Sequence, residues 1–328
     1  MKLCVTGGAG YVGSVVADRL LRDGHEVVVI DNFSTGHRAA VPAGCRLVEG
    51  DVRDDAALAR ALDGVEAVLH FAAASVVAES VRRPLDYFDN NVGGTIRLLR
   101  AMESRGIRRL VFSSTAAVYG APDVLPIEET APCRPENPYG WSKLMVEWML
   151  AQARPAWGLA YVALRYFNAG GACGACGEDH RPESHLIPIV LEAALGLRER
   201  VTVFGSDYPT RDGTCVRDYI HVSDLAEAHV LALAAMARGF SGSLNLGSEN
   251  GCTVREVIRA TERVTGREIV VENGPRRAGD PPALIASSRA AQGTLGWVRR
   301  ESALDEIIRS AYEWRRANPD GYRGGGAP

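Results

Sequence analysis

Short apolar runs alternate with amphipathic stretches through the first half of the chain. Runs that are bounded by Gly, Asp or Asn predict buried strands. These predicted strands are Lys2–Thr6, Glu26–Ile30, Arg46–Glu49, Ala67–His70, Arg109–Ser113 and Ala160–Arg165. Apolar residues at helical spacing predict the intervening helices Tyr11–Asp23, Asp54–Leu62, Asn90–Arg105 and Tyr139–Ala156. Strands that alternate with such helices are typical of βαβ units, so we expect an α/β fold with a doubly wound parallel sheet.

The second half of the chain is less regular than the first. Its strands are short, and turns such as Gly205-Ser206-Asp207 interrupt it. The helical candidates are His185–Leu197, Ser223–Arg238, Val254–Thr265 and Ser302–Ala317. We expect this half to form a smaller C-terminal α/β lobe, with some elements returning to the main sheet.

Composition narrows the class of protein. The chain has 328 residues, 46% of them hydrophobic, and at roughly 150 residues per domain this suggests about two domains or one elaborate one. The 35 glycines and 16 prolines exceed an average share but are too few for a disordered or collagen-like chain. The glycine excess therefore needs a local explanation.

The charge pattern argues against nucleic acid and membrane partners. A net charge of −3 without a dense Lys/Arg stripe offers no electrostatic footprint for nucleic acid. The longest apolar stretches fall far below the ~18 residues that span a bilayer. The N-terminal MKLCVTGGAG is too short and too glycine-rich before any cleavage site for a signal peptide. We therefore expect a cytoplasmic protein.

The seven cysteines form an odd, scattered set, as expected of reduced thiols in the cytosol. Cys173 and Cys176 make a CxxC motif, which can bind zinc or act in redox chemistry. Neither a second such pair nor a suitably spaced His pair accompanies it. We interpret the motif as a glycine-rich loop with two thiols, and we assign no metal ligands.

A glycine loop connects the first predicted strand to the first predicted helix. Gly7, Gly10 and Gly13 allow a tight turn, close approach of a pyrophosphate and packing of the helix on the strand. The helix N-terminus then offers free N–H groups and a positive dipole to phosphates. Asp31 ends the second strand and can accept hydrogen bonds from an adenosine ribose, which favours NAD over NADP. An ordinary turn with a capping Asp is the alternative, and we favour a Rossmann-type dinucleotide site.

Asp51 closes the third predicted strand. Asp is a common helix N-cap, which would explain it without a ligand. At this position it can also bind the adenine amine of a dinucleotide. Both interpretations stay open.

Tyr139 and Lys143 stand four residues apart at the start of a predicted helix, on one face. A phenol is a poor base at neutral pH, but a nearby ammonium and a nicotinium charge both favour the phenolate. The pair therefore makes a tunable acid/base, although the same spacing also occurs in ordinary amphipathic helices. A third, hydroxyl-bearing member is expected in Phe112–Gly120, at the carboxyl end of the fifth strand, where ligands bind in this fold.

Together these motifs resemble the extended short-chain dehydrogenase/reductase superfamily, and within it the UDP-glucose 4-epimerase family. The resemblance runs from Met1 to Tyr322. Besides the glycine loop and Tyr-xxx-Lys, the matching stretches include His70-Phe71-Ala72-Ala73, Arg165-Tyr166-Phe167-Asn168, His185-Leu186-Ile187-Pro188, Phe204–Thr210, Val216–Val222 and Pro275–Asp280.

The resemblance implies NAD-dependent 4-epimerisation that interconverts UDP-glucose and UDP-galactose, in nucleotide-sugar and galactose metabolism. Tyr139 would be the acid/base, Thr115 the proton shuttle, and Lys143 the partner of the nicotinamide ribose. The implied cofactor-binding residues are Gly7, Gly10, Tyr11, Val12, Gly13, Asp31, Asn32, Asp51, Val52, Phe71, Ala72, Ala73, Asn90, Tyr139, Lys143 and Phe167. The implied substrate-binding residues are Thr115, Tyr139, Asn168, His185, Leu186, Thr202, Val203, Phe204, Arg217, Arg277 and Asp280. A homodimer through Asn90–Arg105 and Tyr139–Ala156 is also implied.

Several of these residues have a plainer interpretation. Phe71 and Phe167 could be core residues. Arg217 and Arg277 suit a diphosphate, because guanidinium groups match phosphate oxygens, but surface ion pairs are the commoner fate of arginine. Leu284 stands where the family has a size gate for the sugar, which leaves N-acetylated sugars open; it could equally be a packed strand residue.

The main alternatives are related enzymes and a non-catalytic NAD-binding protein. Nucleotide-sugar 4,6-dehydratases and decarboxylases of this fold carry an acidic residue beside the site hydroxyl, whereas Ala116 and Ala117 follow Thr115 here. A non-catalytic protein would have lost Thr115, Tyr139 or Lys143, and all three are present. We expect an NAD-binding domain over residues 1–166, joined by elements from about 214–247, and a mainly substrate-binding lobe over residues 167–328.

Overall fold

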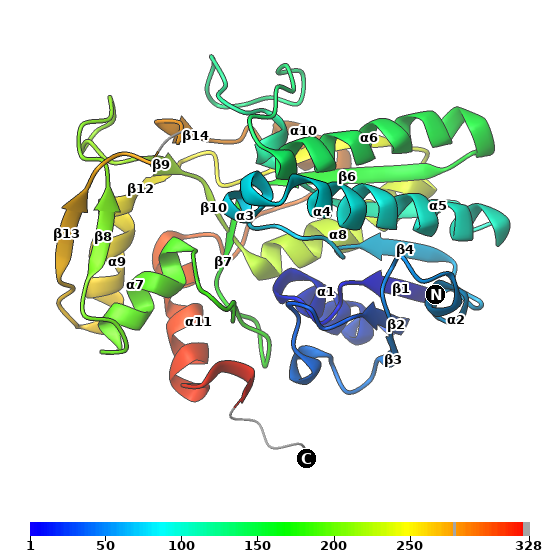
Figure 1. The fold of residues 1–328 in the computed structure, drawn as a ribbon, viewed down its shortest axis with the longest axis horizontal. Helices are drawn as coiled ribbons and strands as arrows, with labels where there is room; N and C mark the ends of the chain where they lie inside the picture. The colour runs from blue at the N-terminus through cyan, green and yellow to red at the C-terminus, as the bar shows by residue number, and fades with distance from the viewer. Residues whose placement is uncertain (278–279, 324–328) are drawn as a thin grey trace.

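The computed structural model describes residues 1–277 and 280–323, so residues 278–279 and 324–328 of the expected substrate lobe lie outside the described residues. A large parallel sheet carries helices on both faces, and a smaller lobe lies beside its edge (Figure 1). The helices are α1 (Tyr11–Arg22), α2 (Asp55–Ala61), α3 (Val77–Arg82), α4 (Pro84–Tyr87), α5 (Gly94–Ser104), α6 (Pro138–Trp157), α7 (Leu186–Ala194), α8 (Val222–Ala237), α9 (Val254–Thr265), α10 (Arg289–Leu295) and α11 (Leu304–Ala317).

Within the described residues, seven strands form the main sheet in the order β11-β6-β5-β4-β1-β2-β3, all parallel. This order confirms the predicted doubly wound α/β fold. The strands are β1 (Lys2–Thr6), β2 (Glu26–Asp31), β3 (Arg46–Glu49), β4 (Ala67–His70), β5 (Arg109–Thr115), β6 (Ala160–Tyr166) and β11 (Gly242–Leu246). Each of the six predicted strands is present, and none differs by more than two residues at either end.

Side-chain alternation along the strands separates two apolar layers. Leu3 and Val5 of β1 pack with α1, α8 and α10 on one face of the sheet. Cys4, between them, packs with α2, α5 and α6 on the other face. All three residues are fully buried. A sheet covered on both faces leaves the carboxyl ends of its strands as the open edge, which is where this fold binds ligands.

The smaller lobe is built from short strands and the remaining helices. Its strands are β7 (Asn168–Gly170), β8 (Val201–Phe204), β9 (Val216–Arg217), β10 (Tyr219–His221), β12 (Cys252–Thr253), β13 (Val271–Gly274) and β14 (Ala283–Leu284). Apolar side chains of α7, α9 and α11 form its core. Among the described residues, no helix is both long enough and apolar enough to cross a membrane.

One predicted helix needs a correction. The sequence predicts a single helix over Asn90–Arg105, but Phe88–Gly93 is a π-helical segment and α5 begins only at Gly94. Asn91 in this segment is buried and hydrogen-bonds Ala74 and Ser142. The π-helical turn goes with these tertiary contacts, which the spacing of apolar residues in the sequence does not reveal.

Candidate active site

A cavity of about 910 Å³ lies along the carboxyl edge of the main sheet and extends into the smaller lobe. Its walls come from the glycine loop, the ends of β4 and β5, the start of α6, and the lobe segments around β8, β9 and β14. One continuous space therefore contacts both the predicted cofactor residues and most of the predicted substrate residues.

The glycine loop has the geometry that close approach of phosphates requires. Gly7 has φ +71°, and a Cβ there would lie 2.6 Å from the backbone N of Ala72. A Cβ on Gly13 would lie 2.2 Å from the Gly7 carbonyl oxygen, so only glycine lets α1 pack this tightly. Gly10 caps α1 without a side-chain hydrogen bond and lines the cavity. The cradle therefore fits a pyrophosphate at the helix N-terminus.

The two predicted carboxylates differ in their surroundings. Asp31 lines the cavity and accepts hydrogen bonds from the backbone N–H groups of Ala9 (2.9 Å) and Phe33 (2.8 Å). Burial raises the pKa of Asp31, and these backbone bonds oppose it. Asp51 does not line the cavity but binds the Arg53 guanidinium at 2.8 Å and accepts from Asn32 at 2.8 Å. The sequence could not reveal this pairing, and the prediction of an adenine contact by Asp51 stays a prediction.

The three predicted catalytic side chains come together where the carboxyl end of β5 meets the start of α6. Thr115 ends β5, while Tyr139 and Lys143 lie on the first two turns of α6, and all three line the cavity. Asn137 caps this helix by accepting from the Gly140 N–H at 2.9 Å. The Lys143 ammonium, on a side chain that is almost fully buried, donates to the Ser113 carbonyl at 2.9 Å and lies 6.0 Å from the centre of the Tyr139 ring.

Burial controls the protonation of this group in the cofactor-free protein. It raises the pKa of Tyr139, and a hydrogen bond with Thr115 opposes the rise. Burial also lowers the pKa of Lys143 to about 7, against an opposing effect of Glu147. The sequence predicted that the Lys143 ammonium and a nicotinium charge together favour the phenolate. In the cofactor-free protein burial has the largest effect on the pKa of Tyr139, so a further positive charge in the cavity, such as the nicotinium, would be needed to favour the phenolate.

The buried amide of Asn91 holds the loop after β4 against the catalytic helix. The Asn91 amide donates to the Ala74 carbonyl (3.0 Å) and to the Ser142 hydroxyl (2.9 Å), and its oxygen accepts from the Ala74 N–H (2.8 Å). Ser142 directly precedes Lys143, so this network joins the loop after β4 to the catalytic helix.

The smaller lobe brings two arginines to the cavity. The Arg217 guanidinium binds Asp280 at 2.6 Å and the Pro281 carbonyl at 2.9 Å. The Arg277 guanidinium lies 4.0 Å from the centre of the Phe204 ring. All of these residues line the cavity, so the ion-pair and ligand interpretations of Arg217 are compatible.

Most of the other predicted residues also reach the cavity. They are Tyr11, Val12, Asn32, Val52, Phe71, Ala72, Ala73, Asn90, Phe167, Asn168, His185, Leu186, Thr202 and Leu284. Val203 does not, because successive strand residues face opposite sides and its side chain is fully buried in the lobe core. Phe71 and Phe167 also pack against core clusters, so both of their interpretations hold together.

Comparison with known proteins identifies the family. A model of the NAD dependent epimerase/dehydratase family matches residues 3–247. The chain belongs to that family. It is 52% identical over 320 residues to the UDP-glucose 4-epimerase of Corynebacterium glutamicum, which covers 98% of this chain and 97% of that protein. It is 50% identical over 327 residues to the UDP-glucose 4-epimerase of Lacticaseibacillus casei, with 98% and 99% covered.

Solved structures agree with this assignment. The UDP-glucose 4-epimerase of Brucella ovis in complex with NAD matches with a TM-score of 0.92 at 48% identity, covering 95% of this chain and 97% of that one. The resemblance to the UDP-glucose 4-epimerase family of the extended short-chain dehydrogenase/reductase superfamily, inferred from the motifs, is confirmed. NAD is the cofactor of this family, and the glycine cradle described above fits it.

The epimerase/dehydratase site also contains residues that the sequence analysis missed. Tyr166 hydrogen-bonds the Ser113 hydroxyl at 2.5 Å beside Lys143 and lines the cavity. Glu178 and His180 line the cavity at its border with the smaller lobe. Two Glu-x-His triplets, Glu178–His180 and Glu183–His185, are visible in the sequence and are the signal that could have drawn attention to this segment.

Proposed function

We propose that the chain interconverts UDP-glucose and UDP-galactose by NAD-dependent epimerisation at C4 of the sugar. The observation that carries the proposal is the convergence of Thr115, Tyr139 and Lys143 on the cavity that the glycine loop also lines. When bound, NAD supplies a reversible hydride acceptor for the sugar carbon.

In this proposal Tyr139 removes the proton from the sugar 4-hydroxyl and later returns it. Thr115 relays that proton, because its hydroxyl lines the same cavity as the phenol and lies close enough to it to lower the pKa of Tyr139. Lys143 supports the phenolate by charge and is held in place by the Ser113 carbonyl. The single acid/base suffices because the same proton leaves and returns.

The smaller lobe is proposed to hold the UDP group. Arg217 and Arg277 are the guanidinium groups suited to the diphosphate oxygens. His185, Leu186, Thr202, Phe204, Asn168 and Asp280 are proposed to complete the contacts with the UDP-sugar. Binding through two arginines and a helix N-terminus needs no basic surface, which is compatible with the mildly acidic composition.

Acceptance of N-acetylated UDP-sugars is the second candidate activity. Leu284 on β14 lines the cavity and packs against the cluster around Phe167, so its side chain limits the space there. We propose that it acts as a gate of intermediate size. A rate on UDP-N-acetylglucosamine comparable to that on UDP-glucose would show that Leu284 does not exclude the larger sugar.

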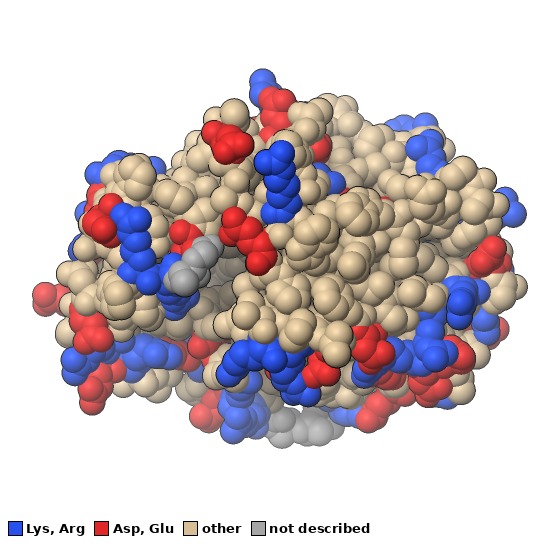
Figure 2. Space-filling model, turned by 45° about the horizontal axis from the view of Figure 1, so that its top comes forward, with Lys and Arg blue, Asp and Glu red and all other residues tan. Residues whose placement is uncertain are grey.

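A homodimer through α5 and α6 is also proposed. Trp141 and Trp148 on α6 are 38% and 54% exposed, with ring centres 6.4 Å apart. Figure 2 shows a broad surface with few charged side chains over the half of the molecule in which Figure 1 places these helices. An exposed aromatic pair on such a surface is typical of protein–protein contacts.

The test is conversion of UDP-galactose by the purified protein with NAD bound. We expect UDP-glucose to accumulate without net formation of NADH. Tyr139→Phe, which removes the proposed acid/base, should lose conversion. Tyr312→Phe removes a phenol hydroxyl on α11, away from the cavity, and as the control should convert substrate normally. Absence of conversion by the wild-type protein would contradict the proposal.

A further inference from the structure

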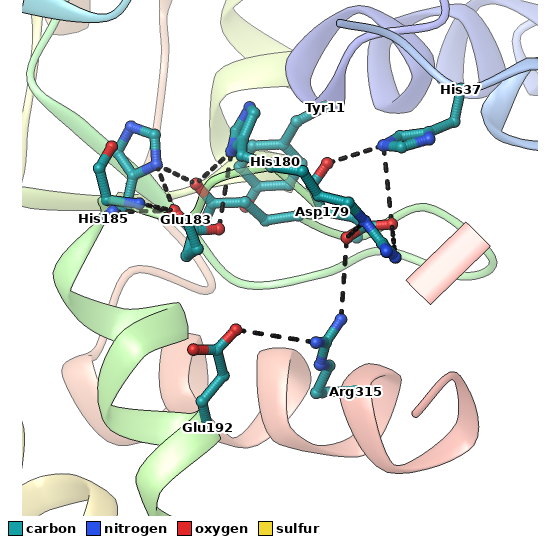
Figure 3. Close-up of polar contacts among 12 residues, drawn as sticks. Tyr11, His37, Asp179, His180, Glu183, His185, Glu192 and Arg315 are labelled. Carbon is teal, nitrogen blue, oxygen red and sulfur yellow. Dashed lines mark hydrogen bonds and ion pairs between the residues drawn. The ribbon is translucent and has the colours of Figure 1, made fainter. Parts of the chain in front are cut away.

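Four side chains gather where the segment between β7 and α7 borders the cavity. One donor atom from each of Glu178, His180, Glu183 and His185 lies within 4.8 Å of all the others. Figure 3 shows the labelled members pointing toward one another near Tyr11 of the cofactor half. None of the four belongs to the catalytic group of Thr115, Tyr139 and Lys143.

The separations between donor atoms approach those of a tetrahedral metal site. Nδ1 of His185 lies 3.0 Å from Glu178 Oε1 and 2.9 Å from Glu183 Oε1. Nδ1 of His180 lies 3.2 Å from Glu178 Oε1 and 3.8 Å from Glu183 Oε2. Zinc–nitrogen and zinc–oxygen bonds of roughly 2.0–2.1 Å place neighbouring donors about 3.3–3.4 Å apart.

The charges in this cluster call for a cation. The side chains of Glu178 and Glu183 are 9% and 7% exposed, and among the described residues no Lys or Arg pairs with either. Nδ1 of His180 is buried and has no hydrogen-bond partner in the part of the chain that the structure describes. A divalent ion would balance two carboxylates and use both imidazoles as neutral donors.

We propose that Glu178, His180, Glu183 and His185 bind one divalent transition-metal ion of the zinc class. Two imidazoles with two carboxylates suit zinc and its first-row neighbours, whereas magnesium and calcium prefer oxygen ligands alone. The nearby CxxC motif is not part of the site. The four mutually close donor atoms include neither thiol, and Cys173 and Cys176 exchange backbone hydrogen bonds in a tight turn.

Contacts around the cluster indicate that the ion would hold the segment 178–185 in the conformation in which it contacts both halves of the molecule. Glu183 Oε1 accepts from the Ser184 and His185 N–H groups at 2.7 and 2.8 Å, at the start of α7. His37, from the cofactor half, hydrogen-bonds the Asp179 carbonyl at 2.8 Å, and the Asp179 carboxylate accepts from the Tyr322 N–H at 3.1 Å. Such surrounding bonds orient metal ligands. The role of the ion would be structural, at the edge of the cavity.

The experiment measures bound metal in tag-free holoenzyme that has been stripped with EDTA, exchanged into chelator-free buffer and loaded with one equivalent of zinc. Mass spectrometry should find about one zinc per chain. His180→Asn and Glu183→Gln should each weaken zinc binding ~10–100-fold or more. Loss of a residue that only hydrogen-bonds a metal ligand already costs this much, so loss of a ligand should cost at least as much. His25→Ala, a histidine directly before β2 at the amino end of the main sheet, should bind zinc like the wild type. Glu183→Gln keeps an oxygen to accept the helix-start bonds, so the fold survives.

Cobalt(II) gives an independent readout, because tetrahedral coordination by the wild type should produce visible absorption bands that both variants lose. Zinc below about one-tenth equivalent in the loaded wild type would overturn the proposal. So would equal binding by wild type and variants, or tighter binding of magnesium or calcium than of zinc. Metal content is measured without turnover, so a failure to bind zinc leaves the proposed epimerase activity standing. Absence of epimerase activity would likewise leave the metal site standing.

Discussion

The Lys143 ammonium donates a hydrogen bond to the Ser113 carbonyl oxygen at 2.9 Å. This bond ties the catalytic helix to the carboxyl end of β5, two residues before Thr115. It also places the ammonium in surroundings dry enough to lower its pKa from 10.5 to about 7.

Lys143→Met should stabilise the cofactor-free protein more at pH 6 than at pH 9.5. Because the folded pKa lies below the unfolded one, the penalty for burying the ammonium is fully present below pH 7 and declines as the pH rises toward 10.5. Urea unfolding of both proteins at the two pH values measures the difference. The chain contains only one other lysine, so Lys2→Met is the matched control and should show no such dependence. A gain from Lys143→Met that is independent of pH would contradict the account.

Thr115→Val should lower kcat and move the rising limb of the pH–rate profile to higher pH. The hydroxyl lowers the pKa of Tyr139, so its removal leaves burial unopposed. A loss of about 10–100-fold is expected, at or below the lower end of general acid–base effects. Thr115→Ser restores a hydroxyl and should recover most of the rate and the original profile. An unshifted profile in the valine variant would rule out this role.

Gly13→Ala should abolish NAD binding and destabilise the fold. The new Cβ would lie 2.2 Å from the Gly7 carbonyl oxygen, inside the backbone of the cradle, which cannot yield as a flexible side chain can. Calorimetric titration with NAD and thermal unfolding measure the two effects. Gly293→Ala in α10 is the control, because nothing lies within 4 Å of its Cβ position. It should leave NAD affinity unchanged and add up to about 1 kcal/mol of stability. Normal NAD affinity in Gly13→Ala would show that the cradle tolerates the shift.

Glu147→Ala should destabilise the protein by about 3–5 kcal/mol, because it leaves the Arg165 charge buried without its partner. Glu147 on α6 and Arg165 on β6 form a buried ion pair, with Nη2 2.5 Å from Oε2. Ser114 of β5 and Ser243 of β11 also donate to this carboxylate. Denaturant unfolding measures the loss.

Arg263→Ala breaks the exposed pair with Asp305 and should cost less than about 1 kcal/mol. Equal losses of unfolding free energy in Arg263→Ala and Glu147→Ala would mean that burial of the Glu147–Arg165 pair does not increase the cost of breaking it.

The sequence predicts the cofactor half well because its signals are local. A buried strand, the glycines at positions 7, 10 and 13 and the four-residue spacing of Tyr139 and Lys143 each report directly on backbone geometry. The short helices α3 and α4 and the π-helical turn at Phe88–Gly93 carry no such periodic signal. Their conformation depends on contacts such as those of Asn91 with a distant loop.

Properties that depend on tertiary burial were also beyond the sequence. Desolvation, not the neighbouring ammonium, has the largest effect on the pKa of Tyr139 in the cofactor-free protein. Val203 alternates into the lobe core, and Asp51 pairs with Arg53 outside the cavity. His185 was assigned to the substrate from the family motif, while its Nδ1 also meets two carboxylates whose burial only the folded chain reveals.

The most direct test of the central claim follows the hydrogen at C4. UDP-galactose deuterated at C4 is converted by the holoenzyme in ordinary water, and NMR locates the label in the UDP-glucose formed. The account predicts that the deuterium stays on C4, while Tyr139→Phe loses about 10²–10⁴-fold in rate. Loss of the label to solvent, or full activity in Tyr139→Phe, would contradict it.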